Sequence, residues 1–516
     1  MKQLYKPYIK LILIVAAGLF ALAFLINEYA KRYINVKLKK ALVNNDSVAY
    51  LIGYQNLSVN VWTGYAGVED FYLRAKEKYE HPPLNTIQLK TPSIHISGIN
   101  LLKILFSNSL EVGTIYFDSP SITINNVDST EERDQSKLPF NLYDLIKKEF
   151  SSLHVEALII KNGNIKLIGR DSANLLILLP KVNLKLTDIG ADSALTSAKS
   201  FLTFSQASLT INNLSGHFLN GLYDFSVPEF NFESRNSSLR IDSFLIQPTL
   251  DKKVFAKKVG LQTDCIQLLL TNLVVQFSNV YDLILHQKIF INKMDIESLS
   301  LYDYWDKNFP RSQVRQALPK TVLASLPYEI DIREITLKSA DILYEELAKG
   351  STETGSISFT KVNGRIRNIS NINMKDTIRI HCSGYMLNKA LLTADILFPL
   401  SQDRFIASLK MESFDMKILN GMIKNFVPVK IKAGIAKSIS MYCEANDHSG
   451  IGTLTFKYSG LEVEVLSQDK AIDKFIMTRV KNFIANEIVL EKDNPRKGVL
   501  RIGKIDYKRD KERNII

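Results

Sequence analysis

The sequence predicts a mainly β protein rich in amphipathic antiparallel strands, with short helices and one N-terminal transmembrane helix. Three observations predict this class. Apolar and polar residues alternate with period two through most of the chain after Lys40, helical periodicity is confined to short stretches, and one long uncharged stretch lies near the N-terminus. Alternation of this kind gives each strand one apolar and one polar face.

The uncharged stretch runs from Leu11 to Ile26 and reads LILIVAAGLFALAFLI. With its apolar neighbours it spans roughly 19 residues, which at ~1.5 Å per residue nearly crosses a ~30 Å hydrocarbon layer. A cleaved signal peptide is the alternative, with Ala21-Leu22-Ala23 as the small-residue cleavage site. That tripeptide lies inside the apolar run, so residues 1–27 are predicted to be an uncleaved anchor. Under either interpretation, the rest of the chain is expected to be exported across the membrane.

The body of the chain shows its alternation most clearly in Lys181–Thr187 (KVNLKLT), where three aliphatic residues share one face. A sheet curled around such a face, with acyl chains filling what side chains leave open, would cover it. The residues predicted to form this apolar floor are Ile122, Ile124, Val182, Leu184, Leu186, Leu209 and Ile211. A β-sandwich or solenoid with a dry core is the alternative, and the residues alone leave both open.

A loose internal repeat also appears, in which one strand leads through a short turn into a second strand. The repeat segments are Leu110–Asn125, Leu153–Leu167, Ile289–Tyr304 and Tyr328–Tyr344. Three of them carry an Asn-Gly, Ser-Pro or Ser-Ala step where the chain is expected to turn. The repeat therefore predicts a series of amphipathic hairpins.

The sequence predicts only a few short helices and one internal boundary. The short helices are predicted at Asn100–Phe106, Phe140–Phe150, Asp306–Leu318, Asp415–Phe426 and Ala471–Ala485. The polar stretch Asp128–Lys137 is predicted to be an exposed loop, and Lys349–Gly355 is the best internal boundary. This gives an anchor at 1–27, a β-rich repeat body at 28–349 and a C-terminal β region with a basic tail at 350–516.

The formal net charge of +12 comes from the two ends of the chain. Residues 1–40 hold eight Lys and Arg against one Glu, and residues 495–513 hold eight against three acidic residues. A nucleic-acid-binding protein needs a basic stripe on its folded surface, whereas basic ends on a neutral body fit anionic lipid headgroups. Membrane lipids are therefore the expected partner, and nucleic acid is not.

Reactive side chains form no recognisable site. The seven histidines are dispersed without metal-ligand spacing, and Asp447-His448-Ser449 is interpreted as a solvated turn because adjacent residues cannot converge like a catalytic triad. The cysteines Cys265, Cys382 and Cys443 are far apart and are expected to be buried free thiols. We therefore expect no enzyme activity, no catalytic residues, no metal site and no cofactor.

The C-terminal third carries a family resemblance. Its motifs are Cys382-Ser383-Gly384-Tyr385, Asp415 to Asn420, Ala433-Gly434, Asn446-Asp447 at a hairpin tip, Gly452, Tyr458 with Leu461-Glu462-Val463, Ala485-Asn486, Asn494-Pro495 and Arg501-Ile502-Gly503. This region resembles the C-terminal region of AsmA-like proteins, the bacterial envelope relatives of TamB and of bridge-like lipid transfer proteins. The N-terminal anchor followed by GINLLKILFSN and LEVGTIYFDSPSITI is similar to the opening of that family.

The resemblance implies an elongated, curved antiparallel sheet that forms a taco-like groove with an apolar floor. It also implies a single-pass anchor in the bacterial inner membrane, with the bulk of the chain in the periplasm. There it would conduct phospholipids between inner and outer membrane and support envelope integrity. An alternative of another class is an assembly or scaffold factor that pairs its sheet edge with outer-membrane or other envelope proteins.

Overall fold

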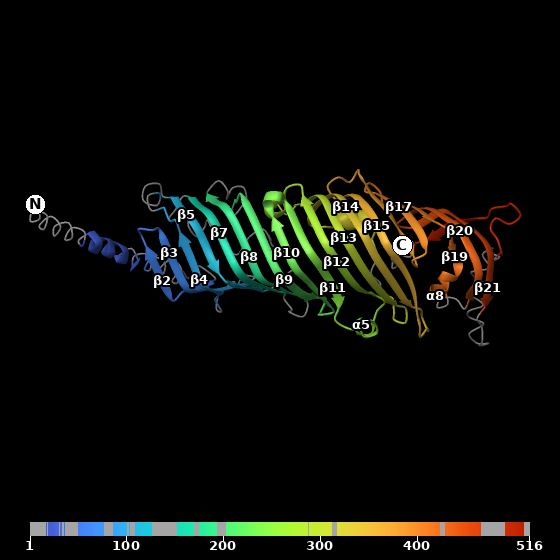
Figure 1. The fold of residues 1–516 in the computed structure, drawn as a ribbon, viewed down its shortest axis with the longest axis horizontal. Coiled ribbons are helices and arrows are strands. Elements are labelled where there is room, and N and C mark those ends of the chain that lie inside the picture. Colours follow the sequence, from blue (N-terminus) through green and yellow to red (C-terminus); the bar gives the residue numbers. More distant parts are fainter. Residues whose placement is uncertain are drawn as a thin grey trace, which may run out of the picture. The chain divides into compact units, whose positions relative to one another are not determined.

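The computed structural model describes residues 17, 19–29, 31, 32, 36, 50–76, 86–100, 103, 109–125, 152–169, 175–192, 203–286, 288–311, 317–423, 429–465 and 491–509. They are mainly strands, as predicted (Figure 1). The chain divides into two compact units near residues 221–236, and strand β10 (Tyr223–Glu233) contributes to both. The expected boundary at Lys349–Gly355 lies inside the second unit, as the turn between two of its strands.

The first unit holds nine further strands. They are β1 (Tyr50–Gly53), β2 (Asn56–Asn60), β3 (Tyr65–Ala75), β4 (Thr86–Ser97), β5 (Ser109–Asp118), β6 (Ser121–Asn125), β7 (Ser152–Ile168), β8 (Leu175–Asp192) and β9 (Gln206–Phe218). Strands β1 and β2 both pair with β3, which pairs with β4. Strands β5 and β6 both lie between β4 and β7, and β8 and β9 follow.

The second unit holds the remaining strands, which pair in chain order except that β19 and β18 both lie beside β20. They are β11 (Ser238–Pro248), β12 (Asp264–Phe277), β13 (Lys288–Asp306), β14 (Glu329–Leu347), β15 (Thr354–Ser370), β16 (Thr377–Met386), β17 (Ala390–Pro399), β18 (Arg404–Met411), β19 (Phe414–Asp415), β20 (Val429–Asn446), β21 (Ser449–Val465) and β22 (Ile502–Lys508).

The sheets are mixed, so the prediction of a purely antiparallel sheet is wrong. Strands β5 and β6 pair in parallel with β7, and β13 pairs in parallel with β14. These are the four repeat segments, and each is a long strand or a strand with one interruption instead of a hairpin. Within each pair the repeats lie side by side in constant register, from Ser109 opposite Ser152 to Asn125 opposite Ile168, and from Lys288 opposite Glu329 to Asp306 opposite Leu347. Parallel pairing requires a crossover connection, and the one between β13 and β14 contains α7.

The steps expected to reverse the chain instead form irregularities within the strands. Ser119 and Asn162, at two of these steps, have positive φ, as do Asp70, Lys181 and Asn213 on other strands of the first unit. The pairing of β7 with β8 shifts register on both sides of Gly163, as an inserted residue requires. Such bulges bend a strand and increase its twist. The Asn-Gly step therefore curves the sheet and does not close a hairpin.

Helices are short. They are α5 (Lys252–Val259), α6 (Val280–His286), α7 (Pro319–Ala324) and α8 (Asn420–Ile423), with 3-10 turns η2 (Ser234–Asn236) and η3 (Met416–Leu419). The helix predicted over Asp306–Leu318 is wrong, because Asp306 ends β13 and the helix begins at Pro319, whose fixed φ suits a first helical position. The prediction over Asp415–Phe426 is met by η3 and α8 as far as Ile423.

Helices α5 and α6 were not predicted. Asp251 caps α5 by accepting a hydrogen bond from the Lys253 backbone N–H at 3.0 Å. The predictions at Phe140–Phe150, Ala471–Ala485 and Asp128–Lys137 lie outside the described residues, as do most residues of Asn100–Phe106.

The predicted anchor lies only partly within the described residues, of which 19–29 are helical. Within the part of the chain that the structure describes, no helix is long and apolar enough to cross a membrane.

Candidate functional site

The clearest feature of the first unit is one sheet face covered by aliphatic side chains. Residues directly opposite each other in a ladder project to the same face. One row of such partners crosses seven strands and consists of Leu57, Val68, Ile94, Phe117, Ile160, Leu184 and Leu209. The next row on the same face consists of Val59, Ala66, Ile96, Ile115, Leu158, Leu186 and Ala207. We call this surface the apolar face of the first unit.

All seven predicted floor residues lie on this face. Val182 and Ile211 are partners across β8 and β9, and alternation places Val182 on the side of Leu184 and Leu186. Ile122 is opposite Ile165, which is two residues from Gly163, the partner of Val182. The alternation of apolar and polar residues in β7 shifts by one position beside Gly163. The bulge inserts one residue at the same point, so apolar side chains stay on one face along the whole of β7.

Burial divides these seven residues. Val182 and Ile211 are 2 % and 4 % exposed, whereas the other five are partly exposed. A core cluster formed by Val112, Leu153, Val155 and Ile189 covers one end of the face and includes Leu186 at its margin. The row through Leu184 and Leu209 lies outside this cluster, so that part of the apolar face keeps contact with solvent.

The opposite face of the first unit is more polar. One row across β4 to β9 consists of His95, Tyr116, Ile159, Lys185 and Ser208, of which only Ile159 is aliphatic. The Tyr65 hydroxyl lies 2.8 Å from Nδ1 of His95 on this side. Adjacent residues such as Leu184 and Lys185 therefore point into different environments.

The second unit has an equivalent apolar face, which the sequence analysis did not identify by residue. One row across β16 to β21 consists of Cys382, Ala394, Leu409, Met441 and Leu454. A parallel row consists of Ile366, Ile380, Ile396, Ala407 and Cys443. The alternation in Leu391–Leu397 carries this signal in the sequence, so it could have been found.

Helices cover the two ends of this second apolar face. At one end Leu318 and Leu323, at the start of and within α7, pack with Phe398 and Phe405, whose ring centroids are 5.5 Å apart. At the other end η3 and α8 supply Met416, Ile418, Leu419 and Ile423 to a cluster around Met386, Ala390 and Phe414. The row through Leu409 and Met441 belongs to neither cluster and stays partly exposed.

Two carboxyl groups interrupt the apolar face of the second unit near α5. Asp303 on β13 pairs with Ile266 on β12 and with Tyr344 on β14. Leu301, two residues away on the same face of β13, belongs to a row of apolar residues. Burial, the nearby charge of Asp264 and a side-chain hydrogen bond with Asp264 together raise the pKa of Asp303 to about 7. Burial also raises the pKa of Asp264. The pair therefore shares a proton near neutral pH, as close carboxyl groups in a poorly solvated site do.

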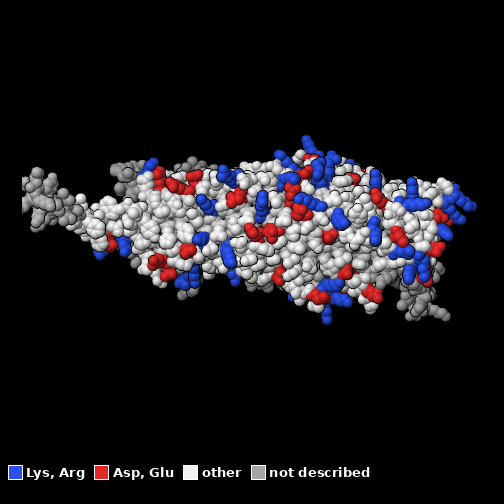
Figure 2. All heavy atoms as spheres, in the orientation of Figure 1, with Lys and Arg blue, Asp and Glu red and all other residues white. Residues whose placement is uncertain are grey.

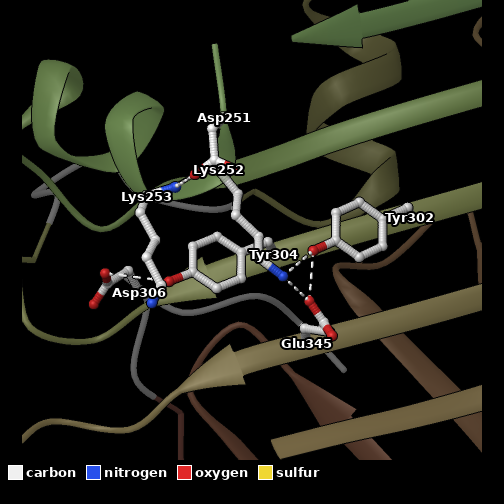
Figure 3. A network of polar contacts seen from close by, with 7 residues as sticks. All are labelled: Asp251, Lys252, Lys253, Tyr302, Tyr304, Asp306 and Glu345. Atoms are coloured by element: carbon white, nitrogen blue, oxygen red, sulfur yellow. Dashed lines mark hydrogen bonds and ion pairs between the residues drawn. The ribbon is translucent and has the colours of Figure 1, made fainter. Parts of the chain in front are cut away.

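The other side of the same strands carries a polar network beneath α5 (Figure 3). Lys252 Nζ donates to the Tyr302 hydroxyl at 2.9 Å and forms an ion pair with Glu345, to which the Tyr302 hydroxyl also donates at 2.5 Å. The Tyr304 ring centroid is 5.1 Å from Lys252 Nζ, and its hydroxyl donates to Asp306 at 3.3 Å. Burial, and then the hydrogen bond to Glu345, raise the pKa of Tyr302 to about 12. This network joins α5 to β13 and β14.

The structure also places the turn, the metal-binding residue types and the cysteines that the sequence analysis considered. Asn446 Oδ1 accepts the backbone N–H groups of His448 and Ser449 at 2.8 and 3.0 Å, so Asp447-His448-Ser449 is a turn, as predicted. Among the described residues no group of three or more His, Cys, Asp or Glu could hold a metal ion. The cysteines are free, with Cys265 and Cys443 buried and Cys382 partly exposed.

Charges on the surface are mixed in sign. On the face drawn in Figure 2, Lys and Arg are interspersed with Asp and Glu along the strands of each unit. That drawn surface has no single-sign stripe among its described residues.

The two partly exposed apolar faces are therefore the candidate functional site, since partly exposed rows of apolar side chains are typical of binding surfaces. No protein-family model matches the chain, and no curated protein matches it at significant similarity.

Proposed function

We propose that this is a membrane-anchored bacterial periplasmic protein whose apolar faces bind phospholipid acyl chains and conduct lipids between the inner and outer membrane, supporting envelope integrity. The observation that carries the proposal is the row of apolar partners that crosses seven strands between β2 and β9, whose members other than the buried Ile94 are partly exposed. A second such row crosses β16 to β21. No catalytic residue is part of the proposal.

The physical driving force would be burial of acyl chains. Each CH₂ group removed from water contributes about 0.8 kcal/mol, so contact with a few strands holds a chain without a polar pocket. Because neighbouring rows are equivalent aliphatic surfaces, a chain that leaves one row meets another of similar affinity. A surface of this kind suits movement along the sheet better than tight binding at one place.

Two sequence features support the membrane setting. The basic residues gather at the ends of the chain, where anionic headgroups would attract them. The motifs from Cys382 to Gly503 resemble AsmA-like envelope proteins, and those of them that the structure describes lie in the part of the chain from β16 to β22.

A second candidate function is scaffolding of envelope proteins through a sheet edge. Strand β22 pairs with β21, and all but one of its residues are exposed, including Ile502 at 55 % and Tyr507 at 41 %. An exposed strand can accept a strand from a partner, although lysines such as Lys504 and Lys508 are typical of edges that avoid pairing.

Photo-crosslinking from neighbouring positions tests the proposal. A benzophenone amino acid is placed at Met441, on the apolar face, or at Tyr442, which is 47 % exposed on the other face. Leu184 and Lys185 provide the same comparison in the first unit. The full chain is expressed in bacteria, irradiated and examined by mass spectrometry for phospholipid adducts.

We expect adducts from Met441 and Leu184 and few from Tyr442 and Lys185, because only the former pair faces bound acyl chains. Equal yields from all four positions, or none from Met441 and Leu184, would contradict the proposal. Protein adducts from a probe at Ile502 without lipid adducts elsewhere would favour scaffolding.

A further inference from the structure

The turn between β2 and β3 is fastened to the N-terminal helix. The Val61 backbone N–H donates to Asn27 Oδ1 at 2.9 Å, and the Trp62 indole N–H donates to the Ala23 carbonyl at 3.3 Å. Asn60 Oδ1 accepts from the backbone N–H groups of Trp62 and Thr63 at 3.1 and 3.2 Å. The turn is thus held both to its own strand and to the helix.

The helix and the turn expose large apolar side chains. The exposed fractions are 62 % for Leu19, 78 % for Phe20, 55 % for Leu22, 59 % for Phe24, 63 % for Leu25 and 63 % for Trp62. Successive helical residues are separated by about 100°, so these side chains surround the helix. A helix that is apolar all round needs an apolar environment on every side, which one packed sheet face cannot supply.

The polarity of the chain changes beside Trp62. Ala23, which accepts the indole N–H, is the last alanine of the apolar run, and Asn27, Glu28, Lys31 and Arg32 follow within three turns. Tryptophan is enriched at the level where hydrocarbon gives way to headgroups, because its ring is apolar and its N–H is polar. Trp62 therefore stands at the depth where the helix would leave a bilayer.

We propose that the turn at residues 61–64 is a second membrane contact, with Trp62 in the lipid interface beside the helix. This inference rests on the proposed membrane anchor and goes beyond it. The rows of the first apolar face begin at Leu57 and Val59 on β2, immediately before this turn. The contact would place the first strand of the apolar face against the bilayer surface, so that an acyl chain passes from one to the other without crossing water.

Tryptophan fluorescence tests the inference, because the chain has two tryptophans. The Trp305→Phe variant of the full chain, in which Trp62 is the reporter, is reconstituted in phosphatidylcholine and phosphatidylglycerol vesicles. Some vesicles carry phosphatidylcholine brominated near the headgroup, and others near the chain end. We expect a blue-shifted emission, stronger quenching by the shallow than by the deep bromines, and weak quenching by aqueous acrylamide.

Two control variants are made in a background without either native tryptophan. Phe20→Trp reports on the anchor, and Tyr442→Trp reports on an exposed position of the second unit. Circular dichroism verifies that each variant retains its strands. We expect deep bromines to quench Phe20→Trp and acrylamide to quench Tyr442→Trp.

The outcomes separate the two proposals. Bromine quenching of Phe20→Trp without bromine quenching of Trp62 would overturn the turn contact and leave the anchor standing. Absence of bromine quenching at both positions would overturn both. Protection of Trp62 from bromine and acrylamide alike would indicate burial against protein, such as a second copy of the chain, and would also overturn the inference.

Discussion

Ser109 and Ser152 stand side by side at the first positions of β5 and β7, with their hydroxyl oxygens 2.9 Å apart. This pair starts a parallel ladder that continues without change of register through the interruption at Ser119 and Pro120 into β6. The two copies of the sequence repeat are therefore adjacent in space, and equivalent residues of each copy are partners.

A disulfide tests this parallel register. We expect Ser109→Cys with Ser152→Cys to form a disulfide under mild oxidation, because paired positions bring Cβ atoms within the range such a bond requires. Ser109→Cys with His154→Cys, displaced by two residues on the same strand, is the control and should react little. Peptide mass spectrometry identifies the linked pair, and a higher yield for the control would contradict the register.

Lys252 holds α5 to the sheet. We expect Lys252→Met to lower the unfolding free energy of the second unit by about 1–3 kcal/mol, because the Glu345 carboxylate, 19 % exposed, loses its cation. Urea unfolding measures the change. The added Glu345→Gln should recover part of it, since the double variant leaves no unpaired charge.

The matched control is Lys293→Met, which removes the more exposed ion pair with Asp295, whose side chains are 51 % and 33 % exposed. Its effect should be close to zero. Equal losses in the two variants would contradict the role assigned to Lys252.

Asp303 makes the second unit less stable as pH rises. Its folded pKa of about 7 exceeds the unfolded value of about 4, so the protonated form favours the native state below about pH 4 and this stabilisation is lost as pH rises through 7. At about pH 8 we expect Asp303→Asn to raise the melting temperature by about 2–4 °C, with a smaller gain at about pH 5. Thermal unfolding followed by circular dichroism at both pH values measures this.

Asp242→Asn, which alters an exposed aspartate on β11, is the control for Asp303. A gain that does not depend on pH, or an equal gain in the control, would show that the carboxyl pair is not its cause.

Gly452 on β21 is the pairing partner of Cys443 on β20. A Cβ atom at this position would be 2.1 Å from the Tyr442 carbonyl oxygen and 2.8 Å from the Cys443 Cα, so Gly452→Ala must displace backbone. We expect it to reduce the unfolding free energy by about 2–4 kcal/mol in urea titrations. At Gly421 in α8 a Cβ atom would meet nothing within 4 Å, so Gly421→Ala should be neutral or slightly stabilising.

Much of the local structure follows from the sequence. Alternation in Lys181–Thr187 correctly placed Val182, Leu184 and Leu186 on one face, because side-chain direction in a strand depends only on the parity of the position. The turn at Asp447-His448-Ser449 followed likewise from local chemistry, since the Asn446 side chain satisfies the backbone of the next residues.

The path of the chain between strands did not follow from the sequence. The Asn162-Gly163 step has the composition of a tight turn, yet β7 continues through it as a bulge, since both neighbouring strands continue their ladders past this point. The repeat can likewise be recognised in the sequence, but the alternation of apolar and polar residues is the same in parallel and antiparallel strands. It therefore could not show that the repeat segments pair in parallel instead of forming hairpins.

The sequence by itself determined the β class, the amphipathic faces and the positions of apolar residues on them, because these depend on neighbours a few residues apart. Only the tertiary structure decided which strands are partners, which ends of a face α7 and α8 cover, and that the Asp264 and Asp303 carboxyl groups meet on an apolar face. Those contacts join residues far apart in the chain, and their free energy depends on the packing and solvent exposure that exist only once the sheet has formed.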